Sequence, residues 1–430
     1  MNIREEAQKM KLDAPAMASS SIEMRNAALR AVRDALTAGS GEIFAANAKD
    51  MAAADEAGIS DSIKKRLKFN EGKLRDVLAG IDELIRLPDP LGKVLLAREL
   101  DEGLRLYRVS VPIGVIGVIF EARPDALVQI SSLCIKSGNC AILKGGKETS
   151  ETNRTLFRII YSAAAGAGLP KGCLLQAEQH NEIDELLSCD RDVDLLIPRG
   201  SNQFVQYIMN HTKIPVMGHA DGVCHIYVDR AADLSMAVPV ILDAKTQYPA
   251  ACNAVETILI DRPAADAFLP TLAKAFADAG VTMRGTKEAA DVIKTCGYDC
   301  GVMAEDEFHR EYLDLTVSIR LVDGVKEAVS HINRFGSHHT DSILTEDDGA
   351  AEYFMQMVDS AGVYRNCSTR FADGYRYGFG AEVGISTGKL HARGPVGLDG
   401  LVTYKYKLFG EGHIVGDYAE GKRQFRFRDL

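Results

Sequence analysis

A strand, a helix and a second strand follow one another between Val111 and Lys144, and the first strand is apolar almost without interruption. V-P-I-G-V-I-G-V-I-F is rich in β-branched residues, D-A-L-V-Q-I-S-S-L-C-I-K has helical character, and C-A-I-L ends at Lys144. A strand that is apolar on both of its faces is typical of a parallel sheet covered by helices on both sides. The pattern predicts a βαβ unit in an α/β domain.

The same alternation continues along the chain. Amphipathic helices such as the one over Met24–Leu36 fill roughly the first ninety residues. After Lys144 we expect helices near 152–167 and 202–210 and strands at 193–197 and 225–229, as in a doubly wound dinucleotide-binding domain. A helix near 234–243, the strand E-T-I-L-I and further α/β elements to about Ser342 indicate a second α/β domain that begins near residue 230.

Length and charge exclude several classes of protein. A chain of 430 residues suggests two or three domains at roughly 100–200 residues each. A net charge of −10 argues against general nucleic-acid binding, which needs a basic face. No apolar run approaches the roughly 18 residues of a membrane span, and the charged start M-N-I-R-E-E lacks a secretory core, so we expect a cytoplasmic protein. Nine cysteines, an odd number, favour reduced thiols.

One cysteine, Cys252, lies among small residues in Q-Y-P-A-A-C-N-A. A thiol becomes a nucleophile when its thiolate is stabilised, commonly by a helix N-terminus, and small neighbours let a substrate carbon approach the sulfur. The segment around Cys252 therefore predicts a thiolate stabilised by a helix N-terminus and an open approach to the sulfur. The alternative for any cysteine is a buried core position, and this is our prediction for Cys134, Cys140 and Cys189, which lie in apolar runs.

Two turns and a histidine cluster are further candidate sites. K-G-G-K-E after the strand that ends at Lys144, and P-R-G-S-N after the next long strand, have the residues of phosphate-approaching turns. Each alone is more often an ordinary turn, and together they indicate a nucleotide site. His331, His338 and His339 lack an i, i+4 pairing. We therefore predict hydrogen-bonded structural histidines and no metal site.

The order of these motifs resembles the aldehyde dehydrogenase superfamily: P-I-G-V-I-G, G-N-C-A-I-L-K, R-G-S, a Gly-rich strand entry, then an isolated cysteine among small residues. Within this superfamily, the chain resembles the branch that reduces L-glutamyl 5-phosphate in proline biosynthesis. The segments that carry this resemblance are F-E-A-R-P-D-A, G-H-A-D-G-V-C-H-I-Y-V-D, Y-P-A-A-C-N-A-V-E-T and H-I-N-R-F-G-S-H-H-T-D-S-I. The resemblance implies an NADPH-dependent enzyme that forms L-glutamate 5-semialdehyde and phosphate through a cysteine thioester.

The resemblance also implies roles for individual residues. Lys144 would hold the adenosine ribose or its 2′-phosphate, Gly200 and Ser201 would lie beneath the cofactor pyrophosphate, and Glu311 would hold the nicotinamide ribose, although the usual Phe-Gly-Pro after that glutamate is absent. On the catalytic side, Cys252 would be the nucleophile.

Two further positions of the catalytic site depart from the common superfamily pattern. Arg123 stands where many relatives have an asparagine donor, and would bind the acyl phosphate or the oxyanion; its alternative is a surface salt bridge with Glu121 and Asp125. The superfamily's hydrolytic glutamate is replaced at His219, in H-A-D-G, which favours exchange with phosphate over hydrolysis.

An aldehyde-dehydrogenase-like fold in three parts follows from the resemblance. We expect an NADP-binding domain over 1–98 and 113–229, a catalytic domain over 230–396, and a small β oligomerisation flap over 99–112 and 397–430, whose period-2 strands are typical of edges that pair between subunits. Partners would be other copies of the chain, the small-molecule substrate and the glutamate 5-kinase that supplies it. The alternatives are a hydrolytic or CoA-acylating aldehyde dehydrogenase, or an inactive scaffold protein.

Overall fold

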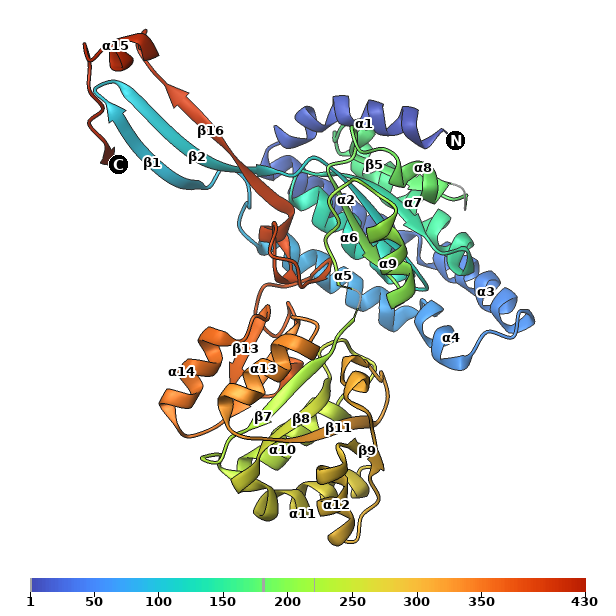
Figure 1. Ribbon diagram of the computed structural model, residues 1–430. Helices are drawn as coiled ribbons and strands as arrows, with labels where there is room; N and C mark the ends of the chain where they lie inside the picture. Colours follow the sequence, from blue (N-terminus) through green and yellow to red (C-terminus); the bar gives the residue numbers. More distant parts are fainter. Residues whose placement is uncertain (1, 180–181, 220) are drawn as a thin grey trace. The chain divides into compact units, whose positions relative to one another are not determined.

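The chain divides into two compact units (Figure 1). The computed structural model describes residues 2–179, 182–219 and 221–430. The first unit contains the chain up to Met217 together with Phe379–Gly384 and Val396–Leu430, and the second contains Gly218–Gly378 and Ile385–Pro395. None of the described helices has the length and hydropathy that crossing a bilayer requires.

A four-stranded parallel sheet forms the centre of the first unit. Its strand order is β5-β4-β3-β6, and every neighbouring pair is parallel. The strands are β3 (Val115–Phe120), β4 (Cys140–Gly145), β5 (Leu174–Ala177) and β6 (Leu195–Arg199). All six residues of β3 are buried, which confirms the predicted strand with two covered faces.

The helices of the first unit follow from polar N-caps and amphipathic spacing. The Ser21 side chain accepts from the Met24 N–H at the start of α2, and Asn70 accepts from the Lys73 N–H at the start of α5. The helices are α1 (Ile3–Ala18), α2 (Ile22–Ala38), α3 (Ser40–Glu56), α4 (Asp61–Leu67), α5 (Glu71–Arg86), α6 (Pro124–Lys136), α7 (Ser150–Gly166), α8 (Glu182–Leu187), α9 (Asn202–Asn210) and α15 (Val415–Ala419). The predicted helices over 24–36, 152–167 and 202–210 are confirmed.

An antiparallel ribbon extends from the first unit (Figure 1). Its order is β16-β2-β1-β17, with the strands β1 (Val94–Asp101), β2 (Leu104–Pro112), β16 (Val402–Phe409) and β17 (Arg428–Asp429). The pairing of β2 with β16 confirms that the two period-2 segments lie together. The ribbon begins at Val94 and not at residue 99, because β1 pairs with β2 along its length.

A seven-stranded parallel sheet forms the second unit, in the order β10-β9-β11-β8-β7-β12-β13. The strands are β7 (Cys224–Val228), β8 (Val255–Asp261), β9 (Thr282–Gly285), β10 (Gly301–Val302), β11 (Thr316–Val322), β12 (Thr340–Leu344) and β13 (Gly362–Arg365). The remaining short strands, β14 (Gly384–Ser386) and β15 (Gly394–Val396), include the points where the chain passes between the units.

Helices cover both faces of this sheet, and alternate residues of each strand contact opposite layers. Ile226 and Ile258 pack in one apolar cluster with α10, α11 and α12, whereas Tyr227 and Leu259 pack in another with α13 and α14. The helices are α10 (Leu234–Thr246), α11 (Arg262–Asp278), α12 (Lys287–Thr295), α13 (Val325–Phe335) and α14 (Asp348–Met357).

The division of the chain differs from the predicted one in a single strand and a short segment. β7 pairs with β8 and β12, so it belongs to the second sheet, and the predicted boundary at residue 229/230 is wrong. Residues 379–384, predicted in the catalytic domain, belong to the first unit. Alternation of strands and helices does not reveal which sheet a strand joins, because both sheets produce the same pattern.

Candidate active site

Cys252 lies in a turn between α10 and β8, and its side chain is partly exposed. The Ala251 N–H donates to the Tyr248 carbonyl and the Ala254 N–H donates to the Ala251 carbonyl. No helix begins at Cys252, since α10 ends at Thr246 and β8 starts at Val255. The predicted stabilisation of the thiolate by a helix N-terminus is therefore wrong, and other groups must provide it.

The turn is held rigidly by its neighbours. Asn253 Nδ2 donates to the Ala372 carbonyl at 2.8 Å, and Thr369 Oγ1 donates to the Asn253 carbonyl at 2.7 Å. A Cβ on Gly222 would lie 2.1 Å from the Cys252 carbonyl oxygen and 2.6 Å from its Cα. The glycine of H-A-D-G is therefore a packing requirement of the cysteine turn, because only a residue without a side chain fits there.

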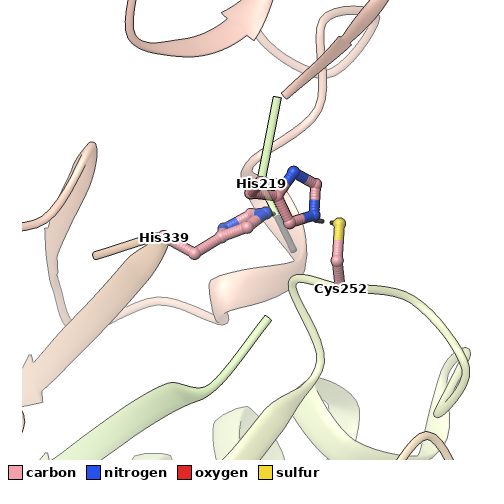
Figure 2. A group of neighbouring side chains, drawn as sticks. All are labelled: His219, Cys252 and His339. Atoms are coloured by element: carbon pink, nitrogen blue, oxygen red, sulfur yellow. Dashed lines mark hydrogen bonds between the residues drawn. The ribbon is translucent and has the colours of Figure 1, made fainter. Parts of the chain in front are cut away.

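His339 provides the direct partner of the thiol. Its Nε2 lies 3.3 Å from Cys252 Sγ, and its Nδ1 lies 2.9 Å from Thr340 Oγ1 (Figure 2). The His339 side chain is almost fully buried. An imidazole at this distance can take the thiol proton and hold the resulting thiolate as an ion pair, the usual arrangement of an activated cysteine.

His219 faces the same thiol and imidazole (Figure 2). Its Nδ1 lies 2.9 Å from the Ile385 carbonyl oxygen. A carbonyl only accepts hydrogen bonds, so Nδ1 carries a proton, and in the neutral imidazole Nε2 is the nitrogen with the lone pair. The rings of His219 and His339 meet edge to face, with centroids 5.1 Å apart. Position 219, where the resemblance implies a glutamate in hydrolytic enzymes, is thus beside Cys252, and in this chain it presents an imidazole.

Strand order explains why these three residues meet. His219 precedes β7, Cys252 precedes β8 and His339 immediately precedes β12, and these strands are neighbours in the order β8-β7-β12. The amino ends of adjacent parallel strands lie at one edge of a sheet. The residues therefore gather at this edge although they are far apart in the sequence.

Arg370 places a buried cation near the thiol. It lies in the short 3-10 helix η4 (Thr369–Phe371), and its Nε donates to Gln247 Oε1 at 3.0 Å. Burial lowers the pKa of Arg370, as does Arg376, whereas the negative charge of a Cys252 thiolate raises it. Among the residues that the structure describes, no carboxylate forms a salt bridge with Arg370. A buried guanidinium with a neutral partner is suited to an anionic ligand.

A buried ion pair holds the two ends of the segment that contains the cysteine turn. Lys245 Nζ, in α10, lies 2.8 Å from Glu256 Oε2, in β8, and both side chains are fully buried. Burial raises the pKa of Glu256 to about 7, and Lys245 opposes this change. Glu311 is close enough to raise it further, so this predicted cofactor residue lies in the same unit as Cys252.

The other predicted cofactor residues lie at the carboxyl ends of strands in the first unit. The Lys144 side chain is buried at the end of β4, and its Nζ donates to the Gly145 carbonyl at 2.7 Å. Burial lowers its pKa, whereas Glu182, Glu148 and Glu178 raise it. A lysine in these surroundings is a fixed positive group near a strand end.

Gly200 and Ser201 form the turn between β6 and α9. A Cβ on Gly200 would lie 2.5 Å from Glu121 Oε2, and the Ser201 N–H donates to that oxygen at 2.9 Å. Arg123 immediately precedes α6, and its side chain is exposed. Its predicted alternative, a salt bridge with Glu121 and Asp125, is not formed within the described residues; Asp125 pairs with Lys73 at 3.0 Å.

Three further cysteines and two further histidines were predicted to have structural roles. Cys134, Cys140 and Cys189 are buried, and burial raises the pKa of each thiol, to about 12 for the first two. This confirms the prediction of core cysteines. His338 Nδ1 lies 2.6 Å from the Asp359 carbonyl oxygen, as expected for a structural histidine.

His331 differs from the prediction. It is buried against Phe308 and Phe335, and neither ring nitrogen has a hydrogen-bond partner in the described structure. Burial lowers the pKa of His331 to about 2, with further contributions from nearby cations and His225. The imidazole packs as a neutral aromatic ring.

Because the folded state keeps His331 neutral, acid should destabilise the protein through this residue. The unfolded chain binds a proton below the usual pKa of 6.5 whereas the folded chain does not, so the loss of stability begins as pH falls through 6.5 and continues toward 2. At pH 5 the penalty is about 2 kcal/mol. Urea unfolding of wild type and His331→Leu at pH 7.5 and 5 measures it: the difference in unfolding free energy should shift by that amount in favour of the variant. A difference in unfolding free energy that is the same at both pH values would contradict the assignment.

Two of the residues around Cys252 were not predicted from the sequence, namely His339 as a thiol partner and Arg370. His339 was assigned a structural role, and Arg370 stands in a polar segment, N-C-S-T-R-F, with no pattern that connects it to a cysteine. Their roles depend on the sheet order and on the position of η4, which local patterns do not encode.

Known proteins resemble this chain over most of its length. Residues 1–292 match the profile of the aldehyde dehydrogenase family. The chain is 52% identical over 430 residues to a gamma-glutamyl phosphate reductase of Pelotomaculum thermopropionicum, covering 100% of this chain and 98% of that protein, and 53% identical over 410 residues to one of Ruminiclostridium cellulolyticum, covering 95% and 94%.

Solved structures give the same result. The crystal structure of gamma-glutamyl phosphate reductase from Thermotoga maritima superimposes with a TM-score of 0.93 at 36% identity, covering 96% of this chain and 100% of that one. An acetylating aldehyde dehydrogenase from Geobacillus thermoglucosidasius, 16% identical with a TM-score of 0.65, shares the fold. The chain therefore belongs to the aldehyde dehydrogenase family, within its gamma-glutamyl phosphate reductase branch.

Proposed function

We propose that the protein reduces L-glutamyl 5-phosphate to L-glutamate 5-semialdehyde and phosphate with NADPH, through a thioester on Cys252, in proline biosynthesis. Relatives that are about half identical over nearly the whole chain bear the name of this reductase. The observation that carries the proposal is the pairing of Cys252 Sγ with His339 Nε2 at 3.3 Å beside the cation of Arg370.

The first step uses the cysteine and the histidine together. His339 Nε2 takes the thiol proton, and the thiolate attacks the acyl carbon of the substrate. The bond between that carbon and the phosphate oxygen breaks, and the phosphate leaves with the electron pair and the proton that His339 holds. The products of this step are a thioester and inorganic phosphate.

Arg370 is the residue of the second unit best suited to the leaving phosphate or the developing oxyanion. Its guanidinium is buried, forms no salt bridge in the described structure and interacts electrostatically with Cys252. Charge-assisted hydrogen bonds in such an environment stabilise developing charge strongly. Arg123 is proposed for the same task on the strength of the family resemblance.

The histidine at position 219, in place of the hydrolytic glutamate, favours the thioester's survival. His219 Nδ1 is engaged with the Ile385 carbonyl. A general base that orients water typically contributes about 10²–10⁴-fold to a rate. Without the glutamate, hydrolysis lacks that contribution and phosphate exchange is preserved.

The turns of the first unit have the chemistry expected for the dinucleotide. Gly200 lets a carboxylate oxygen of Glu121 approach its backbone where a Cβ would clash, and the Lys144 cation lies at the carboxyl end of β4, two strands from β6 in the parallel sheet. Lys144 would hold the adenosine ribose phosphate. The pyrophosphate would lie on Gly200 and Ser201, once Glu121 releases the Ser201 N–H. Glu311 would hold the nicotinamide ribose. NADPH, when bound, supplies the hydride that converts the thioester to the aldehyde. Departure of the aldehyde leaves the Cys252 thiolate, which regains a proton from solvent.

Lys144→Ala should weaken NADPH binding more than NADH binding, by about tenfold or more, because a charge-assisted bond to the 2′-phosphate is available only in NADPH. Equilibrium titration of both cofactors by nicotinamide fluorescence measures the two dissociation constants. Lys171→Ala, which changes an exposed lysine of the same unit, should leave both unchanged. An equal loss for both cofactors would show that Lys144 does not read the 2′-phosphate.

Oxidation of L-glutamate 5-semialdehyde by NADP tests the function as a whole. The proposed phosphorylating enzyme requires inorganic phosphate, so the rate should be near zero without phosphate and should saturate with it. A phosphate-independent rate would indicate the hydrolytic alternative, and dependence on coenzyme A would indicate the acylating one. No oxidation together with slow alkylation of Cys252 would indicate the inactive scaffold.

The antiparallel ribbon of β1, β2 and β16 is proposed as the oligomerisation flap. β16 is an edge strand, and Tyr404, Tyr406 and Leu408 on one face of it are each about half exposed in the single chain. Light scattering of the intact protein should give a mass of at least two chains. The proposal further includes a cytoplasmic location and the glutamate 5-kinase as the source of the substrate.

A further inference from the structure

We propose that His219, Cys252 and His339 form a binding site for a divalent transition metal, with Zn²⁺ as the best fit, and that metal bound there inhibits the enzyme reversibly. One donor atom of each residue lies within 4.8 Å of the others. Within the described parts of the chain, no other group of three histidine, cysteine or acidic donors comes this close. Figure 2 shows the three side chains facing one another.

The distances fit a zinc ion with small side-chain adjustments. Zinc binds thiolate at about 2.3 Å and imidazole nitrogen at about 2.0–2.1 Å in tetrahedral geometry, which places neighbouring donor atoms roughly 3.4–3.6 Å apart. Cys252 Sγ and His339 Nε2 are already 3.3 Å apart. The donor atom of His219 lies within 4.8 Å of the other two, so it must approach them by only about an ångström to complete the set.

The second ring nitrogens of both histidines have the partners that metal-binding histidines need. His219 Nδ1 donates to the Ile385 carbonyl, so in the neutral imidazole Nε2 is the nitrogen that can bind a metal, while His339 Nδ1 is held by Thr340 Oγ1. Hydrogen bonds of this kind fix the tautomer and the ring orientation around a bound metal. Two imidazoles and a thiolate favour zinc and its transition-metal neighbours, whereas Mg²⁺ and Ca²⁺ prefer oxygen ligands, which this set lacks.

Inhibition follows from the electrons that the metal would use. The thiolate lone pair that coordinates the ion is the pair that attacks the acyl carbon, and the His339 Nε2 lone pair is the one that takes the thiol proton. Metal binding and acylation of Cys252 therefore exclude each other. This inhibitory consequence rests on the proposed function, whereas metal binding itself does not.

Cobalt is a direct probe of the site, because Co²⁺ replaces Zn²⁺ in tetrahedral sites and its thiolate complexes absorb in the near ultraviolet. The chelator-treated full-length protein, titrated with Co²⁺ after removal of the chelator, should bind one ion per chain with a thiolate charge-transfer band. Cys252→Ala should lose the band, and His219→Ala and His339→Gln should weaken binding at least about tenfold. Wild-type melting temperatures of the variants show that the fold is kept.

His338→Asn is the matched control. His338 is the direct neighbour of His339, but its Nδ1 is bonded to the Asp359 carbonyl, and asparagine tolerates the positive φ of 61° at this position. This variant should bind Co²⁺ and turn over as wild type does. A charge-transfer band that survives in Cys252→Ala, or equal affinity in wild type and His219→Ala, would overturn the site.

Protection and activity assays complete the test. Zn²⁺ should slow alkylation of Cys252 by iodoacetamide and inhibit turnover, EDTA should reverse both effects, and Mg²⁺ should cause neither. Alkylation does not depend on the identity of the substrate, so Zn²⁺ protection without glutamyl phosphate reduction would contradict only the proposed function. Unprotected alkylation at saturating Zn²⁺ would contradict the metal site.

Discussion

Cys252→Ala is expected to reduce turnover by at least about 10⁴-fold, because the thiolate alone forms the covalent bond to the substrate. NADPH binding should remain, since Lys144, Gly200 and Ser201 belong to the other compact unit. Steady-state rates with L-glutamate 5-semialdehyde, NADP and phosphate, together with cofactor titration of the same preparation, measure both expectations.

Cys367→Ala is the control for this variant. Cys367 is also only partly buried and belongs to the same unit, but burial raises the pKa of its thiol, and its carbonyl accepts from Ser342 Oγ. Its removal should leave the rate within about twofold of wild type, as is usual for a substitution away from the site. Turnover that persists in Cys252→Ala would refute the covalent route.

Arg370→Ala is expected to lower kcat/KM by about 10²–10³-fold, the usual effect of removing one group that stabilises developing negative charge in a water-poor site. The loss should appear in both directions of the reaction, and the KM for phosphate in the oxidative direction should rise. Arg370→Lys should recover part of the loss, because it restores the charge without the two-pronged geometry of a guanidinium.

Arg365→Ala separates this effect from a general loss of positive charge. Arg365 lies in β13 of the same unit and forms a salt bridge with the exposed Asp348. Exposed pairs contribute roughly 0–1 kcal/mol, so this variant should remain close to wild type in rate. If Arg370→Ala keeps the wild-type KM for phosphate and the wild-type kcat, Arg370 does not contact the substrate, and a structural role through Gln247 is sufficient.

Local patterns in the sequence determined most of the elements of this fold. The continuous apolar run before Glu121 became β3 with both faces covered, and the period-2 segments near residues 104 and 401 paired as β2 and β16. These outcomes are predictable because burial of a strand face depends on the spacing of apolar residues along a few positions. The small residues around Cys252 likewise marked the candidate nucleophile without any tertiary information.

The surroundings of that nucleophile were decided by tertiary structure. The thiol lies beside His339, and the Arg370 cation interacts with it electrostatically, whereas no helix begins there. His219 reaches the thiol only because β7 lies between β8 and β12. The same sheet order moved β7 into the second unit. The spacing of apolar residues shows that a strand is buried. It does not show which strand lies next to it, because any neighbour with an apolar face satisfies the same pattern. Sheet order arises from contacts across the whole chain, and it determines which of the chemically capable residues meet.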